Sequence, residues 1–279
     1  MNTPMRRPVM GKAKRKSDQR SAVSGQTSGG RAVLSIIGDS PLVEEYAELC
    51  GSKGYDVVVV RDSKGKGQKS KAFRETGAIP PETSLALELT NTDLPAKRKN
   101  IEQLSKALSP ATAILSSSIT VTATRQSSWM DKKHRLVGFG ALPGFLDRAL
   151  VEVAPTVFSP PETIEVVRTF FHSLGKEIEI VQDRVGMVLP RILCQIINES
   201  IFALQDDVAS PADIDTAMKM GVNYPLGPIE WADRIGFKNV YAVLSALEDD
   251  LREDRYRVAP LLKQMAEGGD WWKQSGTTS

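Results

Sequence analysis

Two short runs of β-branched residues, separated by a helical pattern, constrain the fold of the first half of this chain. Residues 32–37 and 56–60 are apolar and rich in valine and isoleucine, which is typical of buried strands. Between these runs, Leu42, Tyr46 and Leu49 recur at helical spacing. A strand, a helix and a second strand in this order make a βαβ unit, which begins a parallel sheet. The first half is therefore predicted to form an α/β fold.

Further along the chain, strands and helices continue to alternate until the pattern becomes helical from residue 186 onward. We expect an α/β fold class, with a Rossmann-like parallel sheet domain followed by an all-α C-terminal domain. The predicted organisation is a disordered basic tail at 1–31, a dinucleotide-binding-type domain at 32–182 and a helical domain at 183–279. The further strands are predicted at 85–89, 111–115, 135–140, 150–153 and 176–181, with helices at 95–108 and after a capping box at 159–162.

The N-terminal tail differs from the rest of the chain in charge. The 279 residues carry a net charge of +2, but residues 1–31 contain eight Lys and Arg residues and only one acid, Asp18, so by count the tail is +7 and the remainder −5. A mildly acidic body argues against a nucleic-acid-binding surface. The tail lacks a hydrophobic stripe and the apolar core of a secretory signal, so we expect it to be solvated in a cytoplasmic protein. Its Arg- and Ser-rich makeup also allows a transit peptide, which would place the protein in the mitochondrial matrix.

Apolar runs and cysteines argue against two other classes of protein. No stretch approaches the roughly 18 apolar residues that a membrane helix needs, so no membrane association is expected. Cys50 and Cys194 lie in separate segments without metal-site spacing. We therefore predict neither a disulfide nor a metal site, and a reducing compartment.

Three sequence blocks in the second half carry a family resemblance: G-M-V-L-P-R at 186–191, D-I-D-T-A-M at 213–218 and Y-P-L-G-P at 224–228. These blocks resemble the C-terminal helical domain of the 3-hydroxyacyl-CoA dehydrogenases. The resemblance implies NAD-dependent oxidation of a short (S)-3-hydroxyacyl-CoA, such as 3-hydroxybutyryl-CoA, to a 3-ketoacyl-CoA in fatty-acid metabolism. It also implies acyl-CoA as the ligand and a homodimer formed through the helical domain, although packing within one chain would explain the same apolar periodicity.

The turn after the first predicted strand stands where the family has its G-x-G-x-x-G cofactor motif. This chain keeps Gly38 but has Ser40 and Val43 in place of the second and third glycines. Ser40 adds a side chain where the pyrophosphate of NAD approaches, and Val43 adds a branched side chain where helix packs on strand. The family's ribose-binding acid corresponds to Arg61, which stands 23 residues after Gly38. Arg61 is either a contact for the 2′-phosphate of NADP or a solvated arginine at a strand end.

The resemblance places further cofactor and substrate positions in the first half. Glu88 and Lys97 match an acid and a lysine of the family and are candidate cofactor-binding residues. Ser118 and Thr120 lie where the family has a polar segment that contacts nicotinamide and substrate. The loop at 62–84 carries four lysines, which either meet CoA phosphates or form a flexible surface loop.

The family's catalytic positions fall on residues that lack the required chemistry. Its histidine corresponds to Gly140, twelve residues before Glu152, and its asparagine corresponds to Pro190. Glycine has no titratable group and cannot act as a general base. Glu152 matches the glutamate that orients the family's histidine, so Glu152, Ser118 and Thr120 are the remaining candidate catalytic residues.

Two functions are therefore open from the sequence. The nominal function is the family's dehydrogenase activity. The alternative is a catalytically inactive family member that binds acyl-CoA or partners an active subunit. The histidines do not restore the base, because His134 precedes Gly140 by about 20 Å of extended strand and His172 is predicted near a helix end.

Overall fold

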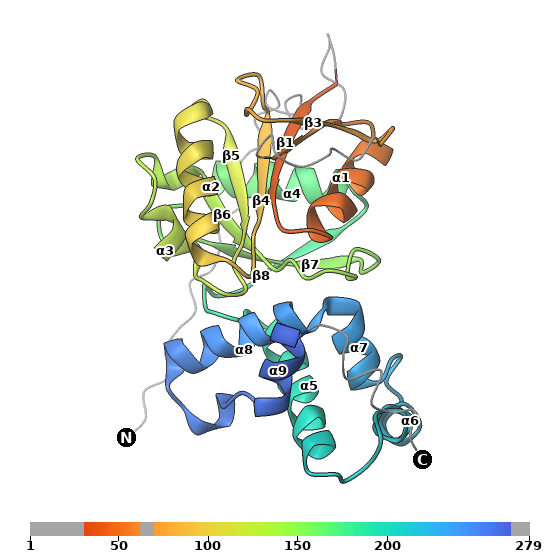
Figure 1. Ribbon diagram of the computed structural model, residues 1–279. Coiled ribbons are helices and arrows are strands. Elements are labelled where there is room, and N and C mark those ends of the chain that lie inside the picture. The colour runs from red at the N-terminus through yellow and green to blue at the C-terminus, as the bar shows by residue number, and fades with distance from the viewer. Residues whose placement is uncertain (1–30, 62–69, 269–279) are drawn as a thin grey trace, which may run out of the picture.

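An eight-stranded sheet forms the first part of the molecule, and a layer of helices lies against one end of it (Figure 1). The computed structural model describes residues 31–61 and 70–268. The strand order is β3-β2-β1-β4-β5-β6-β7-β8, and β6 and β7 pair antiparallel in an otherwise parallel sheet. The strands are β1 (Val33–Gly38), β2 (Asp56–Val60), β3 (Phe73–Thr76), β4 (Leu85–Leu89), β5 (Ala113–Ser117), β6 (Leu136–Phe139), β7 (Leu150–Pro155) and β8 (Glu177–Ile180).

Helices cover both faces of this sheet. On one face α1 (Leu42–Ser52) and α4 (Pro161–Ser173) share a buried cluster with the strands. On the other face α2 (Leu94–Ala107) and the short α3 (Ala123–Ser127) pack against a second cluster. Two helical layers around a parallel sheet confirm the predicted Rossmann-like fold class.

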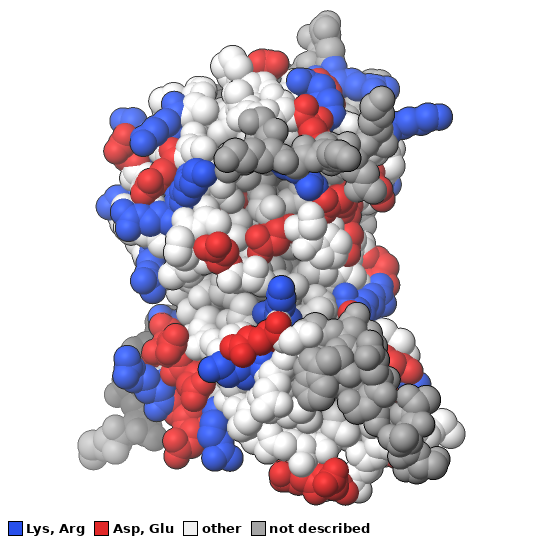
Figure 2. Space-filling model, in the orientation of Figure 1, with Lys and Arg blue, Asp and Glu red and all other residues white. Residues whose placement is uncertain are grey.

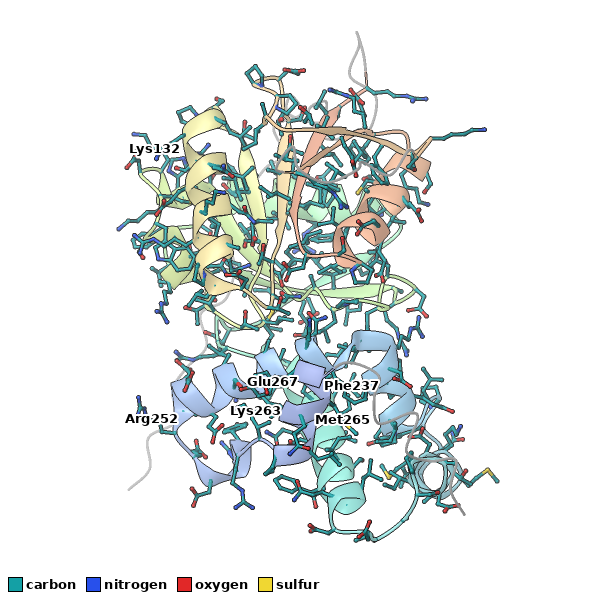
Figure 3. The ribbon with its side chains drawn as sticks, viewed as in Figure 1. Lys132, Phe237, Arg252, Lys263, Met265 and Glu267 are labelled. Carbon is teal, nitrogen blue, oxygen red and sulfur yellow. The ribbon has the colours of Figure 1, made fainter. Side chains whose placement is uncertain are left out.

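The second half of the chain forms the helical layer at the bottom of Figure 1. Its core includes Trp231 and the buried side chains of Phe237 and Met265, both labelled in Figure 3. Apolar side chains at helical spacing on α5 and α8 meet in this core, which explains why the sequence folds here into helices. The helices are α5 (Leu189–Gln205), α6 (Pro211–Val222), α7 (Pro228–Ile235), α8 (Phe237–Leu251) and α9 (Pro260–Gly268), with 3₁₀ turns at Lys133–Arg135 and Asp254–Tyr256.

The surface carries both signs of charge. On the face in Figure 2, basic and acidic side chains of the described residues are interspersed over the sheet part and the helical part. In the described ranges, no helix combines the length and the apolar character that crossing a bilayer requires. Cys50 and Cys194 are both buried as free thiols.

Local structure differs from the sequence predictions at three places. Residues 73–76, predicted as loop, form the edge strand β3. Strand β5 starts two residues later than predicted and includes Ser116 and Ser117. The predicted capping box at 159–162 is wrong, because the N-cap of α4 is Pro160 and the Ser159 hydroxyl instead donates to the Leu136 carbonyl at 3.1 Å.

Some predicted features lie outside the described residues. These are the basic tail apart from Arg31, the lysines at 64, 66 and 69 of the loop before β3, and residues 269–279 at the C-terminus.

The start of α7 is held by a carboxylate from α6. Asp215 accepts hydrogen bonds from the backbone N–H groups of Ile229 and Glu230 at 2.8 and 3.1 Å. Gly227 approaches it so closely that a Cβ there would lie 2.2 Å from the Asp215 carboxylate oxygen. The blocks at 213–218 and 224–228 therefore work together as a helix cap, because a residue larger than glycine would displace the capping acid.

We expect Asp215→Ala to lower the free energy of unfolding by about 1–2 kcal/mol, because two N–H groups of the first turn of α7 lose their acceptor. Urea denaturation followed by circular dichroism measures this loss. Asp249→Ala on the exposed face of α8 is the matched control and should change stability by less than about 0.5 kcal/mol. Equal effects of the two substitutions would contradict the capping role.

Candidate functional site

The three family catalytic positions meet at one apolar cavity between the sheet and the helical layer. Gly140 follows β6, and its N–H donates to the Glu152 carbonyl on β7 at 2.9 Å. Pro190 lies in the first turn of α5. All three line a cavity of about 430 Å³, a size typical of small-molecule sites. Its other walls are mainly apolar and include Leu142, Phe145, Leu150, Leu193, Ile196 and Trp231.

The Glu152 carboxylate is occupied as a helix cap. Its two oxygens accept hydrogen bonds from the backbone N–H groups of Val188 and Leu189 at 2.8 and 2.7 Å. These groups belong to the start of α5, whose first N–H groups have no partner within the helix. Both oxygens of the Glu152 carboxylate are therefore already engaged as acceptors at the start of α5.

The thioether of Met187 lies beside Gly140. A Cβ built on Gly140 would lie 3.5 Å from the Met187 sulfur and 3.6 Å from the Glu152 Cβ. Met187 is buried and has a φ of +48°, a left-handed conformation that is uncommon for a side chain other than glycine. A side chain at position 140 would therefore begin in ordinary van der Waals contact with Met187 and Glu152.

Ser118 and Thr120 lie apart from this cavity. The Ser118 hydroxyl is buried, donates to the Ser116 carbonyl at 3.1 Å and accepts from the Gln126 amide at 3.0 Å. Thr120 lines a different cavity of about 830 Å³, between the carboxyl end of the sheet and α8. The structure thus brings Glu152 together with Gly140 and Pro190, but not with the two hydroxyl residues.

The turn from β1 to α1 departs from a pyrophosphate-binding turn in its charge. Gly38 has a φ of +145°, and a Cβ there would lie 2.5 Å from the Leu89 backbone, so this glycine is required by the fold. Val43 is buried against the sheet. The first turn of α1 carries Glu44 and Glu45. Acidic side chains in a first turn interact favourably with the positive end of the helix dipole, which is the interaction that a bound phosphate would otherwise make.

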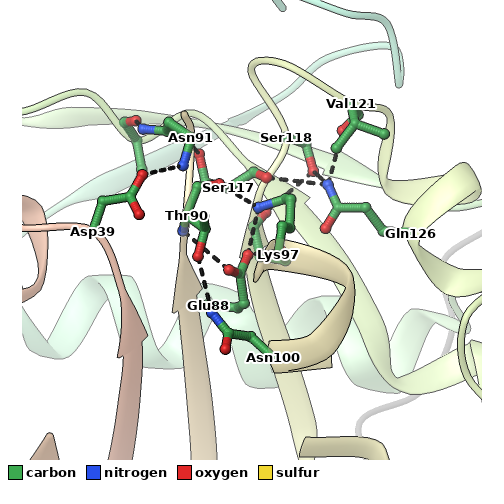
Figure 4. A network of polar contacts seen from close by, with 12 residues as sticks. Asp39, Glu88, Thr90, Asn91, Lys97, Asn100, Ser117, Ser118, Val121 and Gln126 are labelled. Carbon is green, nitrogen blue, oxygen red and sulfur yellow. Dashed lines mark hydrogen bonds and ion pairs between the residues drawn. The ribbon is translucent and has the colours of Figure 1, made fainter. Parts of the chain in front are cut away.

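The Asp39 carboxylate accepts hydrogen bonds from the segment after β4, next to the same turn. One oxygen of its carboxylate accepts from the backbone N–H of Asn91 at 2.9 Å, and from the N–H and hydroxyl of Thr92 at 3.0 Å each. Figure 4 shows this contact between Asp39 and the segment after β4. The chain therefore supplies its own anion beside the turn where the family binds a phosphate.

Arg61, at the position of the ribose-binding acid, forms ion pairs within the protein. It pairs with Glu44 of α1, and its Nε lies 3.3 Å from a Glu75 carboxylate oxygen. Burial raises the pKa of Glu44, but hydrogen bonds from Ser40 and Arg61 outweigh this and lower it overall. Arg61 is therefore paired with two carboxylates and is not a simply solvated arginine, while it remains 39% exposed.

The residues at this turn differ from those with which the family binds a dinucleotide. A cavity of about 520 Å³ adjoins Gly38 and Arg61, so space for an adenosine exists. A pyrophosphate at the start of α1, however, would meet Glu44 and the Asp39 carboxylate, and like charges at close range repel. The position at the end of β2 where the family has its ribose-binding acid is Arg61.

Glu88 and Lys97, the other candidate cofactor residues, form a buried ion pair (Figure 4). Lys97 also donates to the Thr90 carbonyl at 2.7 Å, and Glu88 accepts from the Ser116 hydroxyl at 2.8 Å. The two side chains are 1% and 0% exposed. Burial lowers the pKa of Lys97, and the charge of Glu88 opposes that shift. The pair ties β4 to α2 and β5, and Lys97 also borders the larger cavity that Thr120 lines.

Sequence reasoning missed Tyr46 and Lys176 as cavity residues. Lys176 immediately precedes β8 and Tyr46 lies on α1, and both line the cavity at Gly140. Neither lies in a motif, and Tyr46 was visible only as one position of an apolar helix face. Only the folded arrangement brings segments so far apart in the chain to one cavity.

Comparisons with known proteins agree with the geometry of the fold. A family model described as the 3-hydroxyacyl-CoA dehydrogenase C-terminal domain matches residues 186–278. The chain is 28% identical over 245 residues to a 3-hydroxybutyryl-CoA dehydrogenase of Bradyrhizobium diazoefficiens, covering 87% of this chain and 84% of that protein. It is 29% identical over 269 residues to a probable 3-hydroxybutyryl-CoA dehydrogenase of Deinococcus radiodurans, covering 86% and 96% of the two chains.

Solved structures share the same architecture. The crystal structure of (S)-3-hydroxybutyryl-CoA dehydrogenase from Ralstonia eutropha matches with a TM-score of 0.71 at 24% identity, covering 85% of this chain and 94% of that one. The fold, the C-terminal match and the aligned relatives agree. The chain is similar to 3-hydroxyacyl-CoA dehydrogenases over most of its length, and its residues 186–278 match the C-terminal domain of that family.

Proposed function

We propose that this chain binds a short 3-hydroxyacyl-CoA or 3-ketoacyl-CoA in the cavity at Gly140, and that it holds this substrate without turning it over. The nominal function of the chain is the family activity, NAD-dependent oxidation of a substrate such as (S)-3-hydroxybutyryl-CoA in fatty-acid metabolism. Relatives that carry this name and align over most of their length support the substrate class. The apolar cavity around the three family positions is the observation that carries the binding proposal.

The chemistry of the cavity favours the non-catalytic form of this function. Oxidation of a secondary alcohol needs a base for the hydroxyl proton and an acceptor for the hydride. Gly140 supplies no base, and Glu152 is engaged by the N–H groups of Val188 and Leu189. The binding of NAD, which supplies hydride acceptance in the family, is opposed by Asp39 and Glu44 at the site for its phosphates. Both requirements of the reaction are therefore unmet by these residues.

Calorimetric titration with acetoacetyl-CoA tests the binding proposal. We expect saturable binding to the wild-type protein and its loss in Ile196→Trp, which fills the cavity from α5. Val157→Trp is the matched control, since Val157 is 80% exposed and lies outside the cavity. No binding by the wild-type chain, or equal binding by both variants, would show that the cavity is not the acyl-CoA site.

NADH is expected to bind weakly or not at all, because acidic side chains of the chain occupy the surroundings of its phosphate site. Titration of NADH fluorescence against the pure protein measures this directly. Saturation in the low micromolar range would overturn the account of the β1–α1 turn. A matched test is Glu44→Gln together with Arg61→Asp, which removes one carboxylate charge from the start of α1 and restores the ribose-binding acid. This pair of changes should raise the affinity for NADH.

We also propose a homodimer formed through the helical half. Its support is a group of exposed apolar side chains on α6 and beside it, since Val208, Met220 and Val222 are 72%, 83% and 56% exposed. Light scattering at tens of micromolar protein should give twice the chain mass of 30.5 kDa. Met220→Asp should shift the protein toward monomer, while Val157→Asp, at similar exposure on the sheet part, should not. A wild-type mass of 30.5 kDa would rule out the dimer.

A further inference from the structure

A buried cation lies in the wall of the acyl cavity. Lys176 stands between α4 and β8 and is 6% exposed. Its ammonium group donates to the backbone carbonyls of Leu146 and Arg148 at 2.6 and 2.8 Å. An ammonium group has three donors, so one N–H is left after these two bonds. Lys176 borders the same cavity as Gly140 and Glu152.

This cation lacks a paired carboxylate. Within residues 31–61 and 70–268, no Asp or Glu oxygen lies within 4.0 Å of the Lys176 nitrogen. Asp147 is the acid whose charge acts on it most, but the Asp147 carboxylate already bonds Arg234 at 3.0 Å. Burial lowers the pKa of Lys176, Asp147 opposes this shift, and the nearby charge of Lys53 adds to it. A buried charge without a counter-charge is costly, and proteins normally pair it.

A second buried polar group borders the cavity. Tyr46 is 3% exposed, and its ring meets the ring of Phe139 edge-on at 5.8 Å. Burial raises the pKa of its hydroxyl, so the hydroxyl keeps its proton and can act as a donor. Arg148 adds a further cation to the wall, with its guanidinium held over the rings of Phe145 and Trp231 at 5.9 and 5.4 Å. An otherwise apolar cavity thus carries donors suited to an anion.

We propose that this cavity recognises an acyl thioester whose chain ends in a carboxylate, with Lys176 as the partner of that carboxylate. The proposal rests on the proposed function, which places the acyl group in the cavity. The backbone of Lys176 lies about three strand residues, or roughly 10 Å, from the level of Glu152, because Glu177 lies beside Leu150 and Glu179 beside Glu152. Leu142, Leu146 and Leu150 line the cavity that Lys176 and Glu152 share, so methylene groups of an acyl chain would contact apolar side chains there.

Two probes with the same number of carbons test the proposal. Adipyl-CoA ends in a carboxylate, and hexanoyl-CoA ends in a methyl group. Calorimetry should show that the wild-type protein binds adipyl-CoA about tenfold more tightly or better, as expected for a hydrogen bond between charged groups. In Lys176→Met this preference should disappear while the affinity for hexanoyl-CoA stays within about twofold of wild type. Lys53→Met, a charge removal at an exposed site near Lys176, is the matched control and should keep the preference.

The outcomes separate this proposal from the one on which it rests. If hexanoyl-CoA binds and adipyl-CoA binds no better, the carboxylate proposal is wrong and the acyl site stands. If neither thioester binds, the proposed function itself fails. Free adipate serves as a further probe, and binding as tight as that of adipyl-CoA would show a dicarboxylate site without a thioester. Should Lys176→Met not fold, the wild-type comparison of the two thioesters still decides, and Lys176→Gln supplies a second variant.

Discussion

The wild-type protein is expected to show no measurable NADH-dependent reduction of acetoacetyl-CoA, and Gly140→His is not expected to change this. Loss of a positioned general base typically costs about 10²–10⁴ in rate. The second obstacle that we propose is the charge of Glu44 and Asp39 beside the turn where the family binds the phosphates of NADH. Because these two defects are separate, repairing one leaves the other in place.

A combined variant should behave differently from the single one. Ser40→Gly, Val43→Gly, Arg61→Asp, Gly140→His and Pro190→Asn together restore the family residues at the cofactor turn and the catalytic positions, and Met187→Ala makes room for the imidazole. We expect at most a trace of activity from this combined variant. The decrease in NADH absorbance at high protein concentration measures it. Wild-type turnover near about 1 s⁻¹, within the usual range for enzymes, would show that another base operates.

Lys97→Met is expected to destabilise the protein by about 3–5 kcal/mol, the largest effect on stability that we predict, because it leaves Glu88 buried without its counter-charge. The double variant Lys97→Met with Glu88→Gln should recover much of this loss, since no lone charge then remains in the core. Chemical denaturation with a two-state fit measures both values.

The matched control for Lys97 lies one residue away on the same helix. Arg98 pairs with Glu102 at 2.9 Å, but their side chains are 61% and 37% exposed. Arg98→Met should therefore cost less than about 1 kcal/mol, as is usual for surface ion pairs. If Lys97→Met were no more destabilising than Arg98→Met, the buried Lys97–Glu88 ion pair would not stabilise the sheet.

Much of the fold was predictable because its elements depend on local pattern. Buried parallel strands such as β1, β2 and β4 are continuous apolar runs, and α5 shows apolar residues at helical spacing. Strand β3 was missed because its four residues, Phe73–Thr76, are mostly polar and lie at the sheet edge. Such a strand depends on pairing with β2 and has no pattern of its own.

The candidate site was predictable only in part. Alignment with the family identified Gly140, Glu152 and Pro190, and the structure brings these three together. The alignment could not show that Glu152 caps α5, because this contact joins Glu152 to residues 36 and 37 positions further along the chain. The unpaired charge of Lys176 was equally hidden, because a single lysine in a sequence is normally solvated and only burial distinguishes it.

We propose above all that the chain binds an acyl thioester but does not transfer a hydride to it. The direct test is a single-turnover reaction with stoichiometric protein, acetoacetyl-CoA and NADH carrying deuterium at both C4 positions. Mass spectrometry then measures deuterium in the 3-hydroxybutyryl-CoA formed. We predict no labelled product above a protein-free control, under conditions where calorimetry shows the thioester bound. Labelled product in proportion to the protein added would contradict the account.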